Sequence, residues 1–591
     1  MTCRDGRDVG RLDRRRAVTG LAAFLGTGLT VSRSTAATGG GPIDRLFFGG
    51  PIITVDDARP SAEAVAVRGG RIVGVGARRD LLARFDTRRA EMTDLRGRTL
   101  IPGFVDAHSH VTSVGALAFA AELLPPPDGR GSSVAAIQAV LREQLRTSSV
   151  VRKSGVLIGW GYDDAQLAER RHPTRQDLDA VSTDVPIMII HQSGHLGAYN
   201  TRALEKAGVG ADTPDPPGGR YRRESDGRRP NGVAEEAGHG TLSARLTPRI
   251  SDDEAMAQLD AAQAIYLKHG HTTVQDGRTG AGPLAGLVKA AEGGRLKVDV
   301  VAYPDMVQNR LSSAMQSPLV SRGYANRFRI GGVKFGLDGS PQGKTAWLKT
   351  PYFHPPEGQA AGYSGYPAFA SDDAFEALLT EAYRKNWQVL AHVNGDAAID
   401  QYIRGIERVS QAVPGRDRRP VAIHAQTLRL DQVEAFRRLG IFPALFPMHT
   451  FYWGDWHRDS VLGPERARNI SPTGWLLQRG MRFSSHHDAP VTVPDTMRVM
   501  AATVNRTTRT GEVLGPEHRV SPLVALKAMT LWSAYQHFEE HQKGSIEVGK
   551  RADFVILSDS PLTVPRPRIA EIRVTETIKD GVTLYTRGES A

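Results

Sequence analysis

Two histidines, His108 and His110, stand two residues apart in the stretch "IPGFVDAHSHVTSVG", just after an apolar run and a Pro-Gly pair. In a β-strand, residues i and i+2 point to the same face, so these two imidazoles would lie side by side. Such a pair is typical of a metal site, although a chance pair is the alternative in a chain with 18 histidines. The other ligands of a metal bound here must come from elsewhere in the chain.

Four more polar residues follow apolar, strand-like runs: Lys334, His392, His424 and Asp488. Imidazoles and a carboxylate that converge from successive strands suit Zn²⁺ or a similar divalent ion, which turns bound water into hydroxide near neutral pH. We expect Asp488 to orient this water, take its proton and pass it to the leaving group. The alternatives are a structural turn residue for Asp488 and an ordinary charged lysine for Lys334.

Repeated β–α units are predicted to position these residues. Apolar runs such as "LKVDVVAYP", "WQVLAHVNGD" and "RPVAIHAQ" alternate with amphipathic stretches such as "DDAFEALLTEAYRKN". This alternation favours an α/β fold of the (β/α)8 TIM-barrel type over residues 101–539, whose active residues lie at the carboxyl ends of the strands. A doubly wound open sheet is the alternative. The segment from about 113 to about 262 is too long for one barrel loop, so we expect an insertion over the barrel mouth.

The two ends of the chain have a different pattern. Residues 38–100 and 540–591 contain short alternating apolar runs with Gly-Gly and other turn residues between them. They predict one small composite β-sandwich domain built from both termini. In the first segment we expect an antiparallel sheet.

Composition limits the partners. A hydrophobic fraction of 40% in 591 residues is enough for a large core, which excludes a disordered or fibrous protein. The formal net charge is +11, but 64 acidic residues are spread along the chain, and no basic run with interleaved aromatics is present. We therefore expect no nucleic-acid partner. A homodimer is left open.

Residues 1–37 have the layout of an export signal: a charged region, a short apolar stretch and then small residues. Arg14, Arg15 and Arg16 resemble a twin-arginine signal, which directs folded proteins across the bacterial inner membrane. The apolar stretch is too short and too rich in Gly and Thr for a stable membrane span. We expect an exported protein, with a cytoplasmic one as the alternative. The only cysteine, Cys3, lies in this segment, so the mature chain would have no disulfide.

The ordered motifs resemble the amidohydrolase superfamily, and within it the third amidohydrolase family, which includes N-substituted formamide deformylases. The matching stretches are "LIPGFVDAHSH", "VKFGLDGSPQGKTAW", "LAHVNGDAAID", "VAIHAQ", "SSHHDAPV" and "GSIEVGKRADFVIL". The resemblance implies a (β/α)8 barrel with a flanking composite β-sandwich and a metal-dependent hydrolase activity. It also implies that His108, His110, Lys334, His392, His424 and Asp488 hold one or two divalent ions.

The resemblance further implies that Lys334 is carboxylated and bridges two metals, which requires a depressed lysine pKa. It places His195, in "IIHQSGHLGAYN", near the substrate, with Trp160 and Asp338 as lining or supporting residues. For Glu235 and Glu236 we expect a solvated helix face rather than a catalytic carboxylate. His486 and His487 depart from the family pattern, in which small residues and a serine precede the aspartate.

The predicted reaction is hydrolysis of a C–N bond, amide or formamide-like, in a small organic substrate. A deaminase is less favoured because "AHVNGD" and "IHAQT" offer no glutamate near the strand histidines. A non-catalytic binding protein is less favoured because every ligand position is filled. An ester or carbamate hydrolase stays open, since specificity lies in the loops and the insertion.

Export can be tested on the signal itself. Replacing Arg15 and Arg16 with Lys should leave the precursor inside the cell, because twin-arginine recognition requires the two guanidinium groups. Fractionation and immunoblotting measure the result. Unchanged export of the double variant would show that the signal is misassigned.

Overall fold

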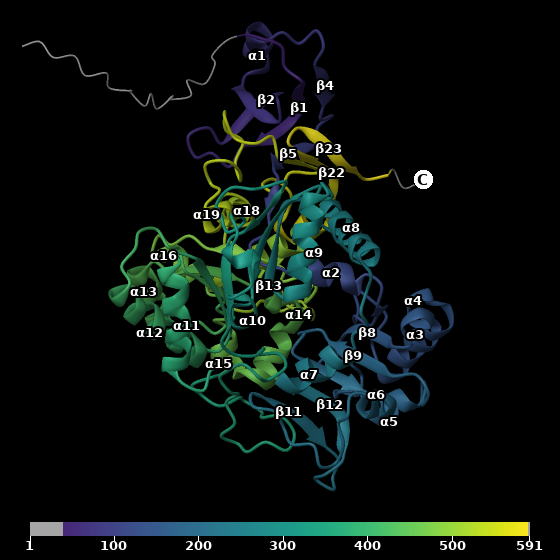
Figure 1. Ribbon diagram of the computed structural model, residues 1–591. Coiled ribbons are helices and arrows are strands. Elements are labelled where there is room, and N and C mark those ends of the chain that lie inside the picture. Colours follow the sequence, from purple (N-terminus) through teal and green to yellow (C-terminus); the bar gives the residue numbers. More distant parts are fainter. Residues whose placement is uncertain (1–39, 589–591) are drawn as a thin grey trace, which may run out of the picture. The chain divides into compact units, whose positions relative to one another are not determined.

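The computed structural model describes residues 40–588, which Figure 1 traces along the chain. The predicted export signal at 1–37 lies outside the described residues. Three groups of strands organise the described chain: parallel strands that carry the predicted ligands, a six-stranded sheet, and a mixed sheet made from both ends.

Parallel strands form the centre of the fold. One sheet has the order β15 (Phe328–Ile330), β14 (Asp299–Pro304), β13 (His271–Thr279) and β6 (Phe104–Val105). The other consists of β16 (Gly332–Gly336), β17 (Gln388–Val393), β18 (Val421–His424), β19 (Phe442–Leu445) and β20 (Ser484–Ser485). Most of their side chains are buried. Burial on both faces explains why these strands appear in the sequence as short continuous apolar runs.

Helices connect the parallel strands, as the β–α pattern predicts. The main ones are α9 (Ala281–Glu292), α11 (Asp372–Arg384), α12 (Asp396–Ala412) and α13 (Leu430–Leu439). In α11, the apolar positions Phe375 and Leu379 belong to the same buried cluster as Val389 of β17. Ser371 caps this helix by accepting a hydrogen bond from Ala374 N. Further helices lie beside the barrel: α2 (Val111–Leu117), α8 (Asp252–Lys268), α14 (Met448–Trp456), α16 (Thr473–Gln478), α17 (Thr496–Asn505), α18 (Pro522–Met529) and α19 (Leu531–Gln536).

The two parallel sheets join at a parallel bridge between Asp305 and Lys334. At the other seam, no strand pairing connects β20 with β6 in the range 40–588. Here the backbone N–H of His110 donates to Ala489 O at 2.8 Å. The strand order and direction are those of a TIM-barrel-type α/β fold, which confirms the predicted class. Closure into a complete ring of paired strands stays a prediction.

The two ends of the chain share one eight-stranded sheet. Its strands are β1 (Arg45–Ile53), β2 (Ser61–Arg68), β3 (Arg71–Gly76), β4 (Glu91–Asp94), β5 (Thr99–Pro102), β21 (Phe554–Leu557), β22 (Val574–Lys579) and β23 (Val582–Thr586). Antiparallel pairing of β5 with β21 joins the N-terminal and C-terminal halves. The expectation of a purely antiparallel N-terminal sheet is wrong, because β1 pairs in parallel with β4 and β5. The sandwich arrangement and the domain limits stay predictions.

The segment expected as an insertion contains a six-stranded sheet of its own. Its strands are β7 (Ala121–Glu122), β8 (Leu157–Tyr162), β9 (Ile187–His191), β10 (Leu196–Tyr199), β11 (Gly219–Arg223) and β12 (Pro230–Glu236), with helices α3 (Val134–Thr147) and α7 (Ala237–Leu246) beside them. Hydrogen bonds tie the residues that follow β8 and β9 to the barrel: Trp453 Nε1 of helix α14 donates to Asp163 Oδ2 at 2.7 Å, and Gln192 Nε2 donates to Val491 O at 3.1 Å. Within the described residues, no helix has both the length and the apolar character needed to cross a bilayer.

Candidate metal centre

The two histidines after β6 direct their Nε2 atoms to one carboxylate. His108 Nδ1 lies 2.6 Å from Gln275 Oε1, and His110 Nδ1 lies 2.6 Å from the carbonyl oxygen of Gly277. Both partners are acceptors, so both rings carry their hydrogen on Nδ1. The unprotonated Nε2 atoms then face Asp488 Oδ1 at 3.3 and 3.4 Å.

His392 at β17 and His424 at β18 face each other. His392 Nδ1 lies 3.1 Å from His424 Nε2, while His392 Nε2 donates to Gly339 O at 3.0 Å. His424 Nδ1 is buried, has no hydrogen-bond partner in the described structure and lies 3.9 Å from Asp488 Oδ2. His424 therefore approaches Asp488 Oδ2, while the His108 pair faces Oδ1, and His392 lies behind His424.

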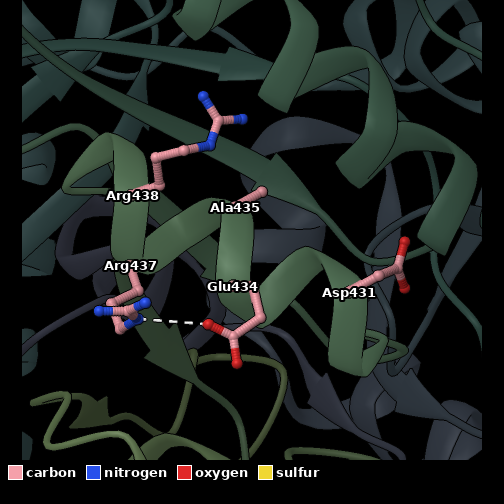
Figure 2. A pocket seen from close by; sticks show the side chains of 5 residues that line it. All are labelled: Asp431, Glu434, Ala435, Arg437 and Arg438. Carbon is pink, nitrogen blue, oxygen red and sulfur yellow. Dashed lines mark hydrogen bonds and ion pairs between the residues drawn. The ribbon is translucent and has the colours of Figure 1, made fainter.

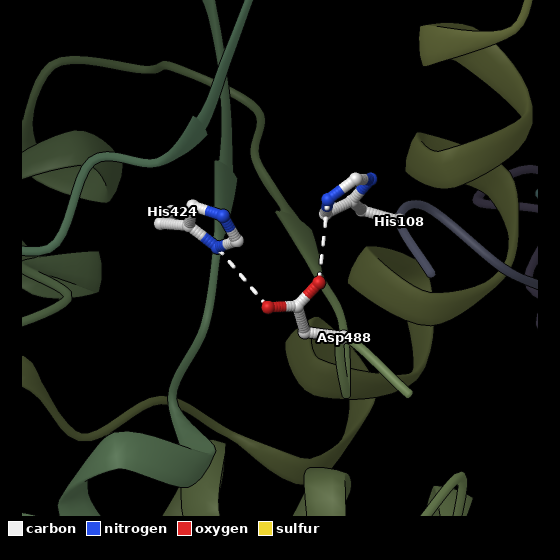
Figure 3. Close-up of side chains that lie close together, drawn as sticks. All are labelled: His108, His424 and Asp488. Atoms are coloured by element: carbon white, nitrogen blue, oxygen red, sulfur yellow. Dashed lines mark ion pairs between the residues drawn. The ribbon is translucent and has the colours of Figure 1, made fainter. Parts of the chain in front are cut away.

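Asp488 connects the two pairs of histidines. One ligand atom each from His108, His424 and Asp488 lies within 4.8 Å of the others, and Figure 3 shows the carboxylate between the two rings. Asp488 Oδ1 is buried and has no hydrogen-bond donor among the described residues. Asp488 has a backbone φ of 54°, in the left-handed region, which is uncommon for a residue other than Gly or Asn and is often found at functional sites.

Lys334 of β16 points into the same group, with Nζ 3.0 Å from His108 Nε2. Its side chain is buried, and burial lowers the pKa of Lys334 to about 7, although the Asp488 charge acts in the opposite direction. Burial, followed by the Lys334 charge, also lowers the pKa of His108 well below its usual value. The His108 ring is therefore neutral near neutral pH, and a substantial fraction of Lys334 is neutral as well.

This donor set fits a divalent cation. Unprotonated imidazole nitrogens that face a carboxylate oxygen without a proton between them repel it, and a buried carboxylate oxygen without a donor is unfavourable. A divalent ion would relieve both conditions, because neutral imidazole and carboxylate are its preferred ligands. The structure thus brings together all six residues predicted as ligands: His108, His110, Lys334, His392, His424 and Asp488.

Two supporting residues were missed from the sequence. Gln275 and Gly277, near the end of β13, hold the rings of His108 and His110. Their stretch, "HTTVQDG", has the same signal as the candidate ligands, polar residues at the end of an apolar run. Such partners fix the ring orientation and the tautomer of metal-binding histidines.

Asp338, predicted as a lining or supporting residue, anchors a loop. Its carboxylate accepts hydrogen bonds from the backbone N–H groups of Asn394, Gly395 and Trp347, at 2.9, 2.7 and 3.1 Å. Asp338 Oδ1 also lies 3.6 Å from His392 Nε2. These contacts place it behind the His392 ligand and support the positioning role.

His195 reaches the centre from the insertion, as expected. Its ring centroid lies 5.2 Å from that of His392, and its Nδ1 lies 2.8 Å from Glu236 Oε2. The expected helix face for Glu235 and Glu236 is wrong, because both belong to strand β12 and Glu235 is buried. The Asp-Gly turn signal before this strand would have indicated a hairpin. Trp160 is buried in β8, with its ring end close to Gly194, next to His195.

Of the two histidines before Asp488, only one faces the centre. The ring of His486 lies 5.3 Å from that of His108 and 5.1 Å from that of His424, and it stacks on Phe446. His487 points away, with its ring 4.9 Å from that of His271.

Comparison with known proteins identifies the family. The sequence model described as "Amidohydrolase family" matches residues 91–585. The chain belongs to this family. It is 26% identical to the putative amidohydrolase YtcJ of Bacillus subtilis, over 92% of this chain and 99% of the relative. It is also 26% identical to the N-substituted formamide deformylase of Arthrobacter pascens, over 92% and 98% of the two chains. A solved structure of an uncharacterized metal-dependent hydrolase from Pyrococcus horikoshii shares the fold, with a TM-score of 0.69 and 22% identity over 88% of this chain and 99% of that one.

A second cluster of acids and histidines in this amidohydrolase is a hydrogen-bonded network. One atom each of Asp163, Asp164 and His191 lies within 4.8 Å of the others. Ser193 N donates to His191 Nδ1 at 3.1 Å, so the ring hydrogen lies on Nε2, which donates to Asp164 Oδ1 at 3.0 Å. That nitrogen has no lone pair left for a metal.

The hollow shown in Figure 2 lies on α13 of the amidohydrolase and is lined by Asp431, Glu434, Ala435, Arg437 and Arg438. Arg437 and Glu434 form an ion pair there at 3.2 Å. No predicted site residue lines this hollow, and ion pairs between exposed side chains of this kind contribute little. This hollow therefore provides no second candidate site.

The ligand assignment can be tested by removing the first pair. Changing His108 and His110 to Ala should remove most of the bound divalent metal at neutral pH, because two nitrogen donors to the same centre are lost. Metal content after dialysis, measured by inductively coupled plasma mass spectrometry, gives the result. His541→Ala, at an exposed histidine, is the control and should keep the wild-type content. Full metal content in the double variant would exclude the assignment.

Proposed function

We propose that this amidohydrolase cleaves a C–N bond of a small organic amide, formamide-like or larger, with water as the nucleophile. The observation that carries the proposal is the Asp488 carboxylate, buried without a donor between facing imidazoles. A bound divalent ion, which we propose to be Zn²⁺, would lower the pKa of the attacking water and polarise the carbonyl group. The similarity to an N-substituted formamide deformylase supports a C–N bond as the target.

The chain's own groups account for the proton transfers. Asp488 accepts a proton from the water whose oxygen adds to the carbonyl carbon, because its free Oδ1 faces the centre. When the C–N bond breaks, the same carboxyl group gives that proton to the leaving nitrogen. His108 and His110 hold fixed orientations through Gln275 and Gly277, so no reorganisation is needed at this step.

A substrate screen with one variant tests this function. Zinc-loaded protein should hydrolyse members of an N-formyl and N-acyl amide panel, and Asp488→Asn should lower kcat by about 10²- to 10⁴-fold because proton transfer is lost. Metal content is measured in parallel, so that loss of metal is separated from loss of the base. Hydrolysis confined to aryl esters, or an active Asp488→Asn enzyme, would contradict the proposal.

We further propose that Lys334 is carboxylated, in which case its carbamate would help the histidines and Asp488 to hold a second divalent ion. Carboxylation needs a neutral amine, and burial brings the pKa of Lys334 down to about 7. A buried ammonium 3.0 Å from His108 Nε2 would also repel a second cation.

The carbamate makes reactivation dependent on CO₂. Apo-protein supplied with zinc should regain activity faster in bicarbonate buffer than in CO₂-depleted buffer, and short carboxylic acids should partly rescue Lys334→Ala. Activity time courses and intact-protein mass measure these effects. Lys344→Ala serves as the control, since Lys344 donates to His354 O and Ser460 Oγ instead, and short acids should give it no rescue. An unmodified lysine in active, metal-loaded enzyme would rule out the carbamate.

A further inference from the structure

Arg278 is an exposed charge at the end of an otherwise buried strand. It is the one exposed residue of β13, with a side chain that is 52% accessible. Its backbone φ is 55°, in the left-handed region, which places it out of line with the strand. Its neighbour Gly277 supplies the carbonyl that holds His110. Arg278 therefore directly follows the residue whose carbonyl group orients His110, a candidate metal ligand.

The guanidinium of Arg278 lies on the barrel-interior side of β16. A Cβ atom placed on Gly336 would be 3.3 Å from Arg278 Cζ and 3.4 Å from Nη1. Gly336 and Lys334 are two residues apart in the same strand, so their Cβ directions share one face. Since Lys334 points into the metal centre, Arg278 occupies the space above it. Glycine at 336 leaves room for this group.

The charge of Arg278 acts on the centre. After burial, it is a further cause that lowers the pKa of Lys334, and it contributes in the same direction for His392. Glu236 of β12, on which the Arg278 charge also acts, is already bonded to His195 at 2.8 Å. Among the described residues, Asp305 is the one carboxylate that forms an ion pair with Arg278.

Asp305 holds only one edge of this side chain. Arg278 Nε donates to Asp305 Oδ2 at 3.0 Å, and Asp305 Oδ1 is occupied by Gln308 N at 3.0 Å. Across the described chain, neither Nη1 nor Nη2 of Arg278 donates to a protein acceptor. A surface pair behaves differently: Arg404 gives both Nε and Nη2 to Asp372, at 2.7 and 3.1 Å. Arg278 is anchored while its two terminal nitrogens remain available.

We propose that Arg278 binds a carboxylate of the substrate, so that the enzyme acts on small amides that carry a carboxylate a few bonds from the scissile C–N bond. Planar guanidinium groups with two free N–H donors match carboxylates in a bidentate manner. N-acylated and N-formylated amino acids have this chemistry. The inference rests on the proposed function, because it assigns the substrate class of the same site.

Binding measured without turnover tests the proposal. In zinc-loaded Asp488→Asn protein, titration calorimetry compares N-formyl and N-acetyl amino acids, over a range of side chains, with their carboxamides. At least one acid should bind more tightly than its amide. Arg278→Met should weaken binding of that acid by about 10- to 100-fold and leave the amide unchanged. Arg278→Lys should bind the acid more tightly than Arg278→Met but less tightly than wild type, since lysine keeps the positive charge and lacks the planar pair of N–H donors.

Matched variants separate recognition from a structural role. Arg404→Met removes a similarly exposed arginine, 43% accessible and paired with an aspartate, and should change neither affinity. Gly336→Ala keeps Arg278 but crowds its guanidinium, so it should weaken binding of the acid more than of the amide. Circular dichroism and thermal midpoints check the fold of each variant.

Two results would overturn the proposal: no acid in the panel binds better than its amide, or Arg278→Met weakens acid and amide equally. The second result would leave Arg278 as a structural partner of Asp305. Failure of the proposed function gives a different pattern. Wild-type enzyme would then hydrolyse neither the N-acyl amino acids nor their carboxamides, although the acids would still bind more tightly than the amides in a way that depends on Arg278.

Discussion

The convergence of unprotonated nitrogens on one buried carboxylate is the constraint on which the site depends. His108 and His110 cannot donate to Asp488, because their hydrogens are used by Gln275 and Gly277. Asp488 Oδ1 consequently faces lone pairs instead of donors. A cation between its members would relieve this repulsion, so the hydrogen bonds behind the histidines favour cation binding at the front of the site.

The barrel supplies this convergence through strand direction alone. Parallel strands end at the same edge, and their last residues are the ones that leave the apolar interior. His424 is the last residue of β18, His392 is the last but one of β17, and Lys334 stands in the middle of the short strand β16. Residues of the expected insertion also reach this region: His195, bonded to Glu236, has its ring 5.2 Å from that of His392, and Trp453 of helix α14 donates a hydrogen bond to Asp163 of the insertion.

The grouping of the candidate ligands could be predicted from the sequence because polar residues at the ends of apolar runs are unusual. His108, Lys334 and Asp488 all show this signal, and the structure brings them together. Arg278 could not be predicted, because its direction depends on a left-handed backbone and on space left by Gly336, which is distant in sequence. The parallel pairing of β1 with β4 could not be predicted for a related reason. The alternation of apolar and polar residues along a strand indicates which face is buried, but not which other strand it pairs with.

The hydrogen bond from His110 N to Ala489 O, at the seam of the barrel, joins residues that are far apart in the sequence. The antiparallel pair of β5 and β21 does the same in the terminal sheet. Neither contact can form until the later of its two partners has left the ribosome. Structures that depend on pairs so distant in sequence form late, after long loops have been closed. The barrel seam and the group of residues around Asp488 thus form only after most of the polypeptide has been made, and a nascent chain that already exposes His108 and His110 has no finished site for an ion.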